Sequence, residues 1–158
     1  MRRLLLALLA PLLVSVLWAQ PSSARTRDTL TADLTDYSTT VSCRGAKILA
    51  TVDTVIEDFG VYTMNSSGKL LEWHVFEGAT STGTYDQIAH LQTTGASGAS
   101  YIWESSGPLY APLTAGKYYV AAICYSAATS VTIRVNTSTS PPNPSFGTFV
   151  TAVSTTTG

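Results

Sequence analysis

The chain has 158 residues, of which 45% are hydrophobic and only 12% are charged, and its formal net charge at pH 7 is −1. With so few basic residues and no basic cluster, it is not expected to bind nucleic acid or an anionic membrane surface. The length suits one domain with a substantial hydrophobic core.

The first 24 residues have the pattern of a secretory signal peptide. Arg2 and Arg3 supply the positive start, the apolar stretch LLLALLAPLLVSVLWA follows, and small residues precede a cleavage site at Ala24. The apolar stretch is short and interrupted by a proline, which argues against a membrane span. We predict cleavage after Ala24, with Ala19 as the second choice and an uncleaved N-terminal anchor as the alternative. The mature chain is then expected to be secreted, or displayed at the cell surface, and not to bind a membrane.

Residues 25–40 form a polar lead-in with a weak pattern, and residues 41–158 are predicted to form a single domain. Short runs with strand-like alternation recur there about every 8 to 12 residues, the spacing of a sandwich or barrel. These runs are KILATVD, TVIEDFGVYTM, KLLEWHVFE, TYDQIAHLQ, YIWES, PLYAPL, KYYVAAICYS, TSVTIRVN and FGTFVTAVS. No helical periodicity is present, and residues with high strand propensity are abundant. The prediction is an all-β, antiparallel β-sandwich that is jelly-roll-like, with about nine strands.

The run KLLEWHVFE makes the most specific local prediction. The turn residues NSSG precede it, so we expect a hairpin with the run TVIEDFGVYTM before them. Trp73 lies on the apolar face of the run and is expected in the core, whereas Glu72 and His74 face the other way.

The run LTAGKYYVAAICYS predicts a central strand that follows an Ala-Gly turn. Alternation separates a face that contains Ala122 and Cys124 from a face that contains Tyr119 and Tyr125. The small residues suit the interior between two sheets, so the tyrosine face is expected to be semi-exposed or covered by a loop.

Cys43 and Cys124 are the two cysteines of the chain. In an exported protein an even number of cysteines predicts a disulfide. This one would close a loop of about 80 residues and contribute about 4–5 kcal/mol in the chain-entropy model. Two buried free thiols are the alternative. Neither cysteine lies in a CxxC motif or a Cys/His cluster, so metal or redox chemistry is not expected.

No catalytic motif is present. The chain contains no GxSxG or HExxH pattern, and its two histidines, His74 and His90, are expected to be exposed or held by structural hydrogen bonds. Glu57 and Asp58 are adjacent and point to opposite faces of a strand, so they do not form the converging pair that a glycosidase needs. The chain is therefore not expected to be an enzyme, or to hold a cofactor or metal. A calcium ion bound by loop oxygens is the alternative.

Several aromatic residues offer flat surfaces on which a sugar ring can stack. Trp103 lies beside Gly- and Ser-rich loops, and Tyr110 lies in the run PLYAPL, whose prolines favour an edge or a short irregular strand. We single out Trp103 and Tyr110 as candidate ligand-binding residues. Ordinary packing of Trp103 in the structure is the alternative.

Three segments together resemble a known type of domain. They are RGAKILATVDTVIEDFGVYTM, LLEWHVFEGATSTGTYDQI and SSGPLYAPLTAGKYYVAAICYS, followed after a Pro-rich spacer by PSFGTF. The residues that carry the resemblance are Trp73, Val75, Phe76, Glu77, Gly83, Tyr85, Leu113, Ala115, Gly116, Tyr118 and Tyr119. Over residues 44–150 the chain is similar to the β-sandwich accessory modules of large secreted and surface proteins of bacteria, which are jelly-roll or carbohydrate-binding-module-like. Such modules continue to a further strand, so the resemblance also implies a truncated C-terminus or a last strand supplied by the lead-in.

The resemblance implies a non-catalytic extracellular module with a structural, adhesive or binding role. A carbohydrate-binding module is the first alternative, and an assembly or pilin-like subunit that uses an open sheet edge is the second. The expected partner is a polysaccharide or another surface protein.

Overall fold

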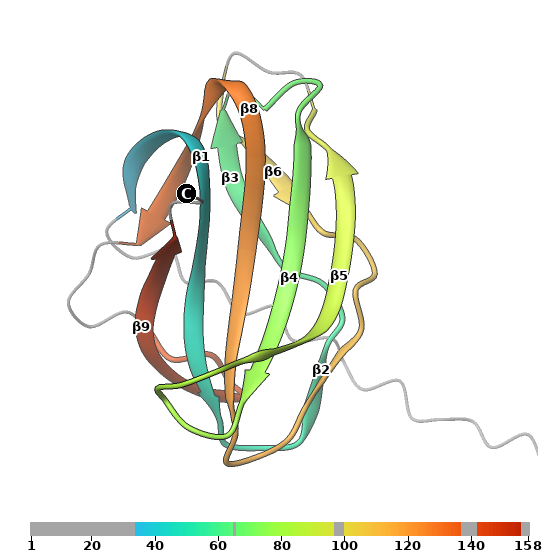
Figure 1. Ribbon diagram of the computed structural model, residues 1–158, viewed down its shortest axis with the longest axis vertical. Helices are drawn as coiled ribbons and strands as arrows, with labels where there is room; N and C mark the ends of the chain where they lie inside the picture. The colour runs from blue at the N-terminus through green and yellow to red at the C-terminus, as the bar shows by residue number, and fades with distance from the viewer. Residues whose placement is uncertain (1–33, 65, 97–99, 137–141, 156–158) are drawn as a thin grey trace, which may run out of the picture.

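The computed structural model describes residues 34–64, 66–96, 100–136 and 142–155, and these residues form nine strands (Figure 1). The strands are β1 (Leu34–Ala50), β2 (Thr54–Ile56), β3 (Gly60–Met64), β4 (Leu70–Gly78), β5 (Asp86–Thr94), β6 (Ile102–Ser105), β7 (Ala111–Leu113), β8 (Tyr118–Asn136) and β9 (Gly147–Thr155). Strand β1 therefore starts inside the segment 25–40 that was interpreted as a lead-in. The predicted signal peptide, residues 1–24, lies outside the described residues.

In the part of the chain that the structure describes, no helix is long and apolar enough to cross a membrane.

The first eight strands pair in a nested order, in which β1 pairs with β8 and each inner pair lies between them in the sequence. All pairs are antiparallel: β1 with β8, β2 with β7, β3 with β6, and β4 with β5. This nesting is the connectivity of a jelly roll. Strand β8 also pairs with β4 and β3, and β9 adds to the other edge of β1. The prediction of an all-β, jelly-roll-like antiparallel sandwich is confirmed.

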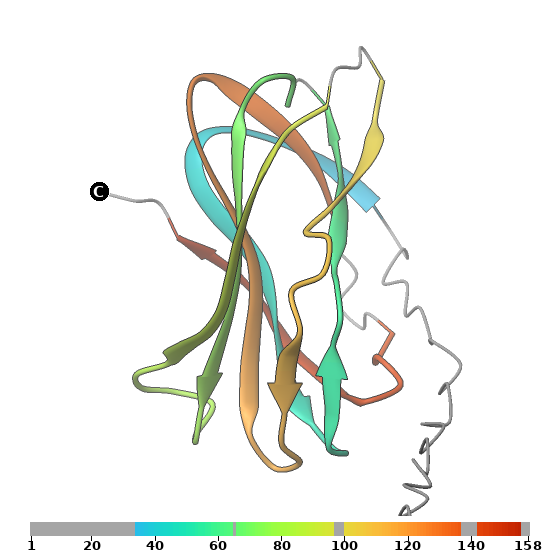
Figure 2. The same cartoon turned by 90° about the vertical axis from the view of Figure 1, so that its right-hand side faces the viewer.

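Figure 2 shows two layers with the long strands β1 and β8 bending across the top from one layer to the other. One layer has the strand order β5-β4-β8-β1-β9, and the other contains β3 and β6, continued by the pair β2-β7. Strand β8 pairs with β4 up to Ser126 and with β3 at Thr132 and Ile133. A register shift in the β1–β8 ladder lies between Thr39 and Val41, close to this bend. Such bulges increase the local bend and twist of a strand pair, which lets both strands change layers.

The hydrophobic core lies between the two layers. Its largest fully buried side chain is Trp73 of β4, whose indole meets the ring of Phe59 edge-on at 5.3 Å between centroids. The indole Nε1–H donates to Thr93 Oγ1 at 2.7 Å, so the one polar atom of this side chain is hydrogen-bonded. The prediction that Trp73 belongs to the core, with Glu72 and His74 on the opposite face, is confirmed.

The predicted hairpin across the NSSG turn is wrong. The run before the turn is divided between β2 and β3, and β3 pairs with β6 and β8 whereas β4 pairs with β5 and β8. The turn instead connects two strands that follow one another along the same edge of β8. Its Ser66 is buried, and the Ser66 hydroxyl donates to Glu104 Oε1 of β6 at 2.7 Å. This buried hydrogen bond holds the turn against β6, so the turn does not close a tight hairpin.

The faces predicted for the first half of β8 are also reversed. Tyr119, Ile123 and Tyr125 are buried in the core, whereas Cys124 is half-buried on the outer face. Because two packed layers lie about 10 Å apart, large side chains are needed to fill the space between them. The small residues Ala122 and Cys124 instead lie on the outer face of the sheet, which carries the disulfide.

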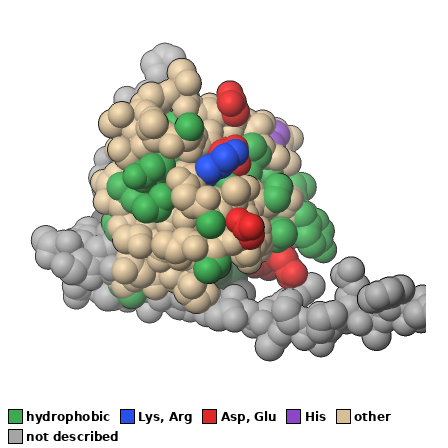
Figure 3. Space-filling model, turned by 90° about the horizontal axis from the view of Figure 1, so that it is seen from below, with side chains coloured by type: hydrophobic (Ala, Val, Ile, Leu, Met, Phe, Trp, Pro, Cys, Tyr) green, Lys and Arg blue, Asp and Glu red, His purple; other side chains and the backbone are tan. Residues whose placement is uncertain are grey.

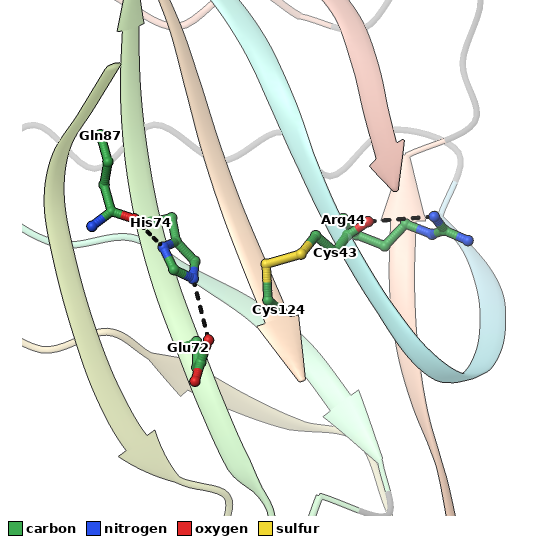
Figure 4. Close-up of a disulfide and its surroundings, with 6 residues drawn as sticks. All are labelled: Cys43, Arg44, Glu72, His74, Gln87 and Cys124. Carbon is green, nitrogen blue, oxygen red and sulfur yellow. Dashed lines mark hydrogen bonds and ion pairs between the residues drawn. A yellow bond between two sulfur atoms is a disulfide. The ribbon is translucent and has the colours of Figure 1, made fainter. Parts of the chain in front are cut away.

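The disulfide joins Cys43 of β1 to Cys124 of β8, which are opposite one another in the ladder with Cα atoms 4.0 Å apart (Figure 4). The disulfide predicted from the number of cysteines and the compartment is thus present in the structure. A disulfide indicates an oxidising environment of the extracellular type.

Candidate functional site

The outer face of the β3–β6 pair carries two exposed aromatic rings. Tyr62 and Trp103 are opposite one another in the ladder, with exposed fractions of 38% and 41%. Their ring centroids are 5.1 Å apart and the ring planes meet at 70°, an edge-to-face contact. We call these two residues the aromatic pair. Two large apolar side chains thus lie exposed side by side on this face.

A glycine leaves room for the indole of this pair against the sheet. A Cβ atom built on Gly60 would lie 2.6 Å from Cζ2 of Trp103 and 2.3 Å from the carbonyl oxygen of Glu104. No real Cβ atom tolerates such contacts, so the Trp103 ring occupies the space that any other residue at position 60 would fill. The missing side chain at position 60 therefore leaves room for the indole against the backbone of β3.

A cation–aromatic contact lies beside the same layer. The guanidinium carbon of Arg134 on β8 lies 4.0 Å from the centroid of the Tyr101 ring, within the range of a cation–π interaction. Arg134 is exposed, whereas Val131 and Ile133 on the opposite face of β8 are buried. A hydrogen-bond donor is thus held on the outside of this part of the sandwich.

Tyr110, the other candidate residue, lies in the loop immediately before β7. It is 59% exposed, and its φ of 53° is in the left-handed region, which is unusual for a bulky residue. The backbone N–H of the neighbouring Leu109 donates to the carbonyl of Glu57 at 2.8 Å, and Leu109 itself is buried. This anchor turns Tyr110 outward. Trp103 and Tyr110 are thus both exposed and belong to the same layer, but they come from different strand pairs.

A second cluster lies on the outer face of the other layer. His74 of β4 and His90 of β5 are opposite one another, and their rings stack with centroids 4.6 Å apart and an interplanar angle of 13°. Nε2 of His74 is 3.5 Å from Oε2 of Glu72, which lies two residues earlier on the same face. One ligand atom from each of these three residues lies within 4.8 Å of the others. We call Glu72, His74 and His90 the histidine cluster.

Two glutamines border the histidine cluster. Oε1 of Gln87 lies 2.9 Å from Nδ1 of His74, as Figure 4 shows, and the Gln92 amide donates to Oε1 of Glu72 at 3.0 Å. Alternation along the sequence places Gln87 and His90 on opposite faces. The ladder shifts register between Val75 and Phe76, which skips one residue of β5 and brings Gln87 to the outer face.

No protein-family model, curated protein or solved structure matches this chain. Its fold is an all-β domain of antiparallel sheets with a disulfide.

Two further polar networks connect elements of the sandwich. The buried hydroxyl of Tyr119 donates to Oε2 of Glu77 at 2.8 Å and accepts from the Thr114 backbone N–H at 2.7 Å, while Lys117 pairs with Oε1 of Glu77. Hydrogen bonds from Lys117 and Tyr119 lower the pKa of Glu77, and the hydrogen bond to Glu77 raises the pKa of Lys117. Desolvation is the main cause that raises the pKa of Tyr119. Each of these polar groups is bonded to another member of the network, so the network stabilises this end of the sandwich.

The second network surrounds the buried carboxylate of Glu104. Its Oε1 accepts from the Ser66 hydroxyl at 2.7 Å and from the Ala96 backbone N–H at 2.8 Å. These bonds join three separate segments of the chain. Glu104 is thus held by structural hydrogen bonds.

The sequence alone singled out Trp103 and Tyr110, and it did not single out Tyr62 or the histidine cluster. The missing signal is strand register, because residues 74 and 90 become neighbours only when β4 and β5 pair. The signal for this cluster in the sequence is a pair of outward-facing histidines on two consecutive strands.

Proposed function

We propose that the protein is a secreted, non-catalytic β-sandwich module that binds a polysaccharide through the outer face of the β3–β6 layer. The observation that supports this function is the aromatic pair, Tyr62 and Trp103, with Gly60 leaving room for the indole against the backbone. An aromatic side chain is rigid beyond its two torsions, so ordering it against a sugar costs little conformational entropy. The function agrees with the type of bacterial accessory module that the sequence resembles.

The low charge of the chain is compatible with an uncharged ligand. Charged residues make up only 12% of the chain. At the end of the sandwich seen from below, Figure 3 shows a basic side chain and several acidic ones among mostly uncharged atoms. Stacking on aromatic rings and hydrogen bonds from Arg134 do not require charge on the ligand. A neutral glycan is therefore compatible with this face, and the guanidinium of Arg134 can also pair with an acidic one, so the panel contains both.

The experiment is a thermal-shift screen against a panel of neutral and acidic polysaccharides, followed by affinity electrophoresis in the glycan that raises Tm. Trp103→Ala is expected to weaken binding by at least about tenfold, because a central aromatic contact contributes about 2 kcal/mol or more. Tyr62→Ala and Tyr110→Ala should weaken it less. Val150→Ala, on β9 of the other layer, removes a side chain that is 40% exposed and serves as the matched control.

Binding that survives in Trp103→Ala would show that the aromatic pair is not the site. If no polysaccharide raises Tm, the carbohydrate-binding function is rejected.

A second candidate function is assembly through a sheet edge. Strands β5 and β9 end the five-strand layer, and each pairs with one neighbour within the described residues. An unpaired edge can accept a strand of another chain. Elution of the purified protein as a polymer, with no response to any glycan, favours this function over the first.

A further inference from the structure

We propose that the histidine cluster binds a divalent transition-metal ion, and that Zn²⁺ is the ion its ligands suit best. This site is independent of the aromatic pair, because it lies on the outer face of the opposite layer. The chain has two histidines in total, and β4 and β5 place them directly opposite one another.

The ligand atoms have spacings close to those of a metal site. In a tetrahedral zinc site with bonds of about 2.0–2.1 Å, neighbouring ligand atoms are about 3.3 Å apart. Nε2 of His74 and Oε2 of Glu72 are already 3.5 Å apart. The widest spacing in the cluster is at most 4.8 Å, and the exposed ring of His90 can close this gap by a side-chain rotation. Three protein ligands would leave a fourth position for water or for a ligand from outside.

Gln87 prepares His74 to act as a ligand. An amide oxygen only accepts hydrogen bonds, so the contact at 2.9 Å requires the proton of the neutral imidazole to be on Nδ1. The lone pair is then on Nε2, the atom that faces Glu72 (Figure 4). Metal-binding histidines usually donate their other ring N–H in this way, which fixes the tautomer and the ring orientation. Gln92 holds the Glu72 carboxylate through its other oxygen.

The donor set determines the class of ion. Two imidazoles and one carboxylate suit zinc, copper and nickel, whereas calcium and magnesium prefer oxygen ligands alone. The chain's two cysteines are joined to each other, so no thiolate competes for the ion. The alternative role of the cluster is a local ion pair between protonated His74 and Glu72. At 3.5 Å this contact is longer than a good charge-assisted hydrogen bond, which is about 2.7–2.9 Å.

The test is titration of the tag-free oxidised protein with Zn²⁺ in a calorimeter. One Zn²⁺ per chain is expected, and Ca²⁺ should give no signal. His90→Ala and Glu72→Gln should each weaken binding by at least about tenfold, and Gln87→Ala should weaken it although all three ligands remain. The matched control is Asp86→Asn. It removes an exposed carboxylate from β5, the strand of His90, and should leave the Zn²⁺ affinity unchanged.

Co²⁺ supplies an independent readout, because its visible absorption bands become much more intense and shift when protein ligands replace water in a four-coordinate site. These bands are expected with the unmodified protein and should be absent with His90→Ala. Because His90 is exposed, the urea midpoint of His90→Ala should match that of the unmodified protein, which separates lost ligation from lost folding. Equal Zn²⁺ affinity in the unmodified protein and His90→Ala, or no Zn²⁺ binding by either, would overturn the proposal.

Discussion

Removal of the disulfide should lower the free energy of unfolding by about 4.5 kcal/mol. Cys43 and Cys124 are 81 residues apart in the sequence. For a loop of this length the chain-entropy relation gives about 15 cal/mol/K, or about 4.5 kcal/mol at 25 °C. The two cysteines belong to strands that pair on both sides of the bond, so the ladder does not need the bond to define its register. The effect should therefore fall on the unfolded chain, with the native fold kept.

The assay is urea unfolding of the oxidised protein, the reduced protein and the Cys43→Ala/Cys124→Ala variant. With a slope of about 2 kcal/mol/M, the expected loss moves the midpoint down by about 2 M urea. Since both cysteines are half-buried and not fully enclosed, reductant should reach the bond in the folded protein. The double variant controls for direct effects of the reductant, because its midpoint should not change when reductant is added.

Coincident midpoints for the oxidised and reduced proteins, with thiols shown to be free by titration, would refute the loop-entropy reasoning. Two reactive thiols in the denatured but unreduced protein would refute the disulfide itself.

Two further predictions concern the network of Glu77, Lys117 and Tyr119. Tyr119→Phe removes a buried hydroxyl that makes two hydrogen bonds, one to a carboxylate, and should cost about 1–3 kcal/mol in urea unfolding. Tyr118→Phe is the control on the neighbouring half-buried residue, and an equal loss in both variants would contradict the assignment. Because the folded pKa of Glu77 lies below its ordinary value of 4.5, its contribution to stability is present above pH 4.5 and is lost as the pH falls through the folded value. Glu77→Gln should therefore reduce the slope of unfolding free energy against pH below 4.5, and an unchanged slope would show that the carboxylate is not coupled to folding.

The alternation of apolar and polar residues was enough to predict the fold class. Because side chains alternate across a strand, the pattern around Trp73 placed it in the core and Glu72 and His74 outside, as the structure has them. Composition and two cysteines in a chain with a signal-like start were enough to predict the disulfide. These features depend on local periodicity and chain chemistry, and neither requires knowledge of which strands pair.

The predictions that failed depended on the partner of each strand. Alternation divides β8 into two faces but does not say which is inside, and the larger residues, led by Tyr119, fill the core. The NSSG turn has hairpin chemistry, yet the buried bond from Ser66 to Glu104 directs it across the layers.

The histidine cluster shows most clearly what tertiary structure decided. His74 and His90 are neighbours because of the β4–β5 register, and Gln87 reaches them because a register shift reverses the alternation of β5. The same is true of the aromatic pair, since Tyr62 meets Trp103 only through the β3–β6 ladder. The sequence by itself determined which side chains share a face of a regular strand, through its two-residue period. The tertiary structure decided which of them meet, because pairing and bulges are set by long-range packing.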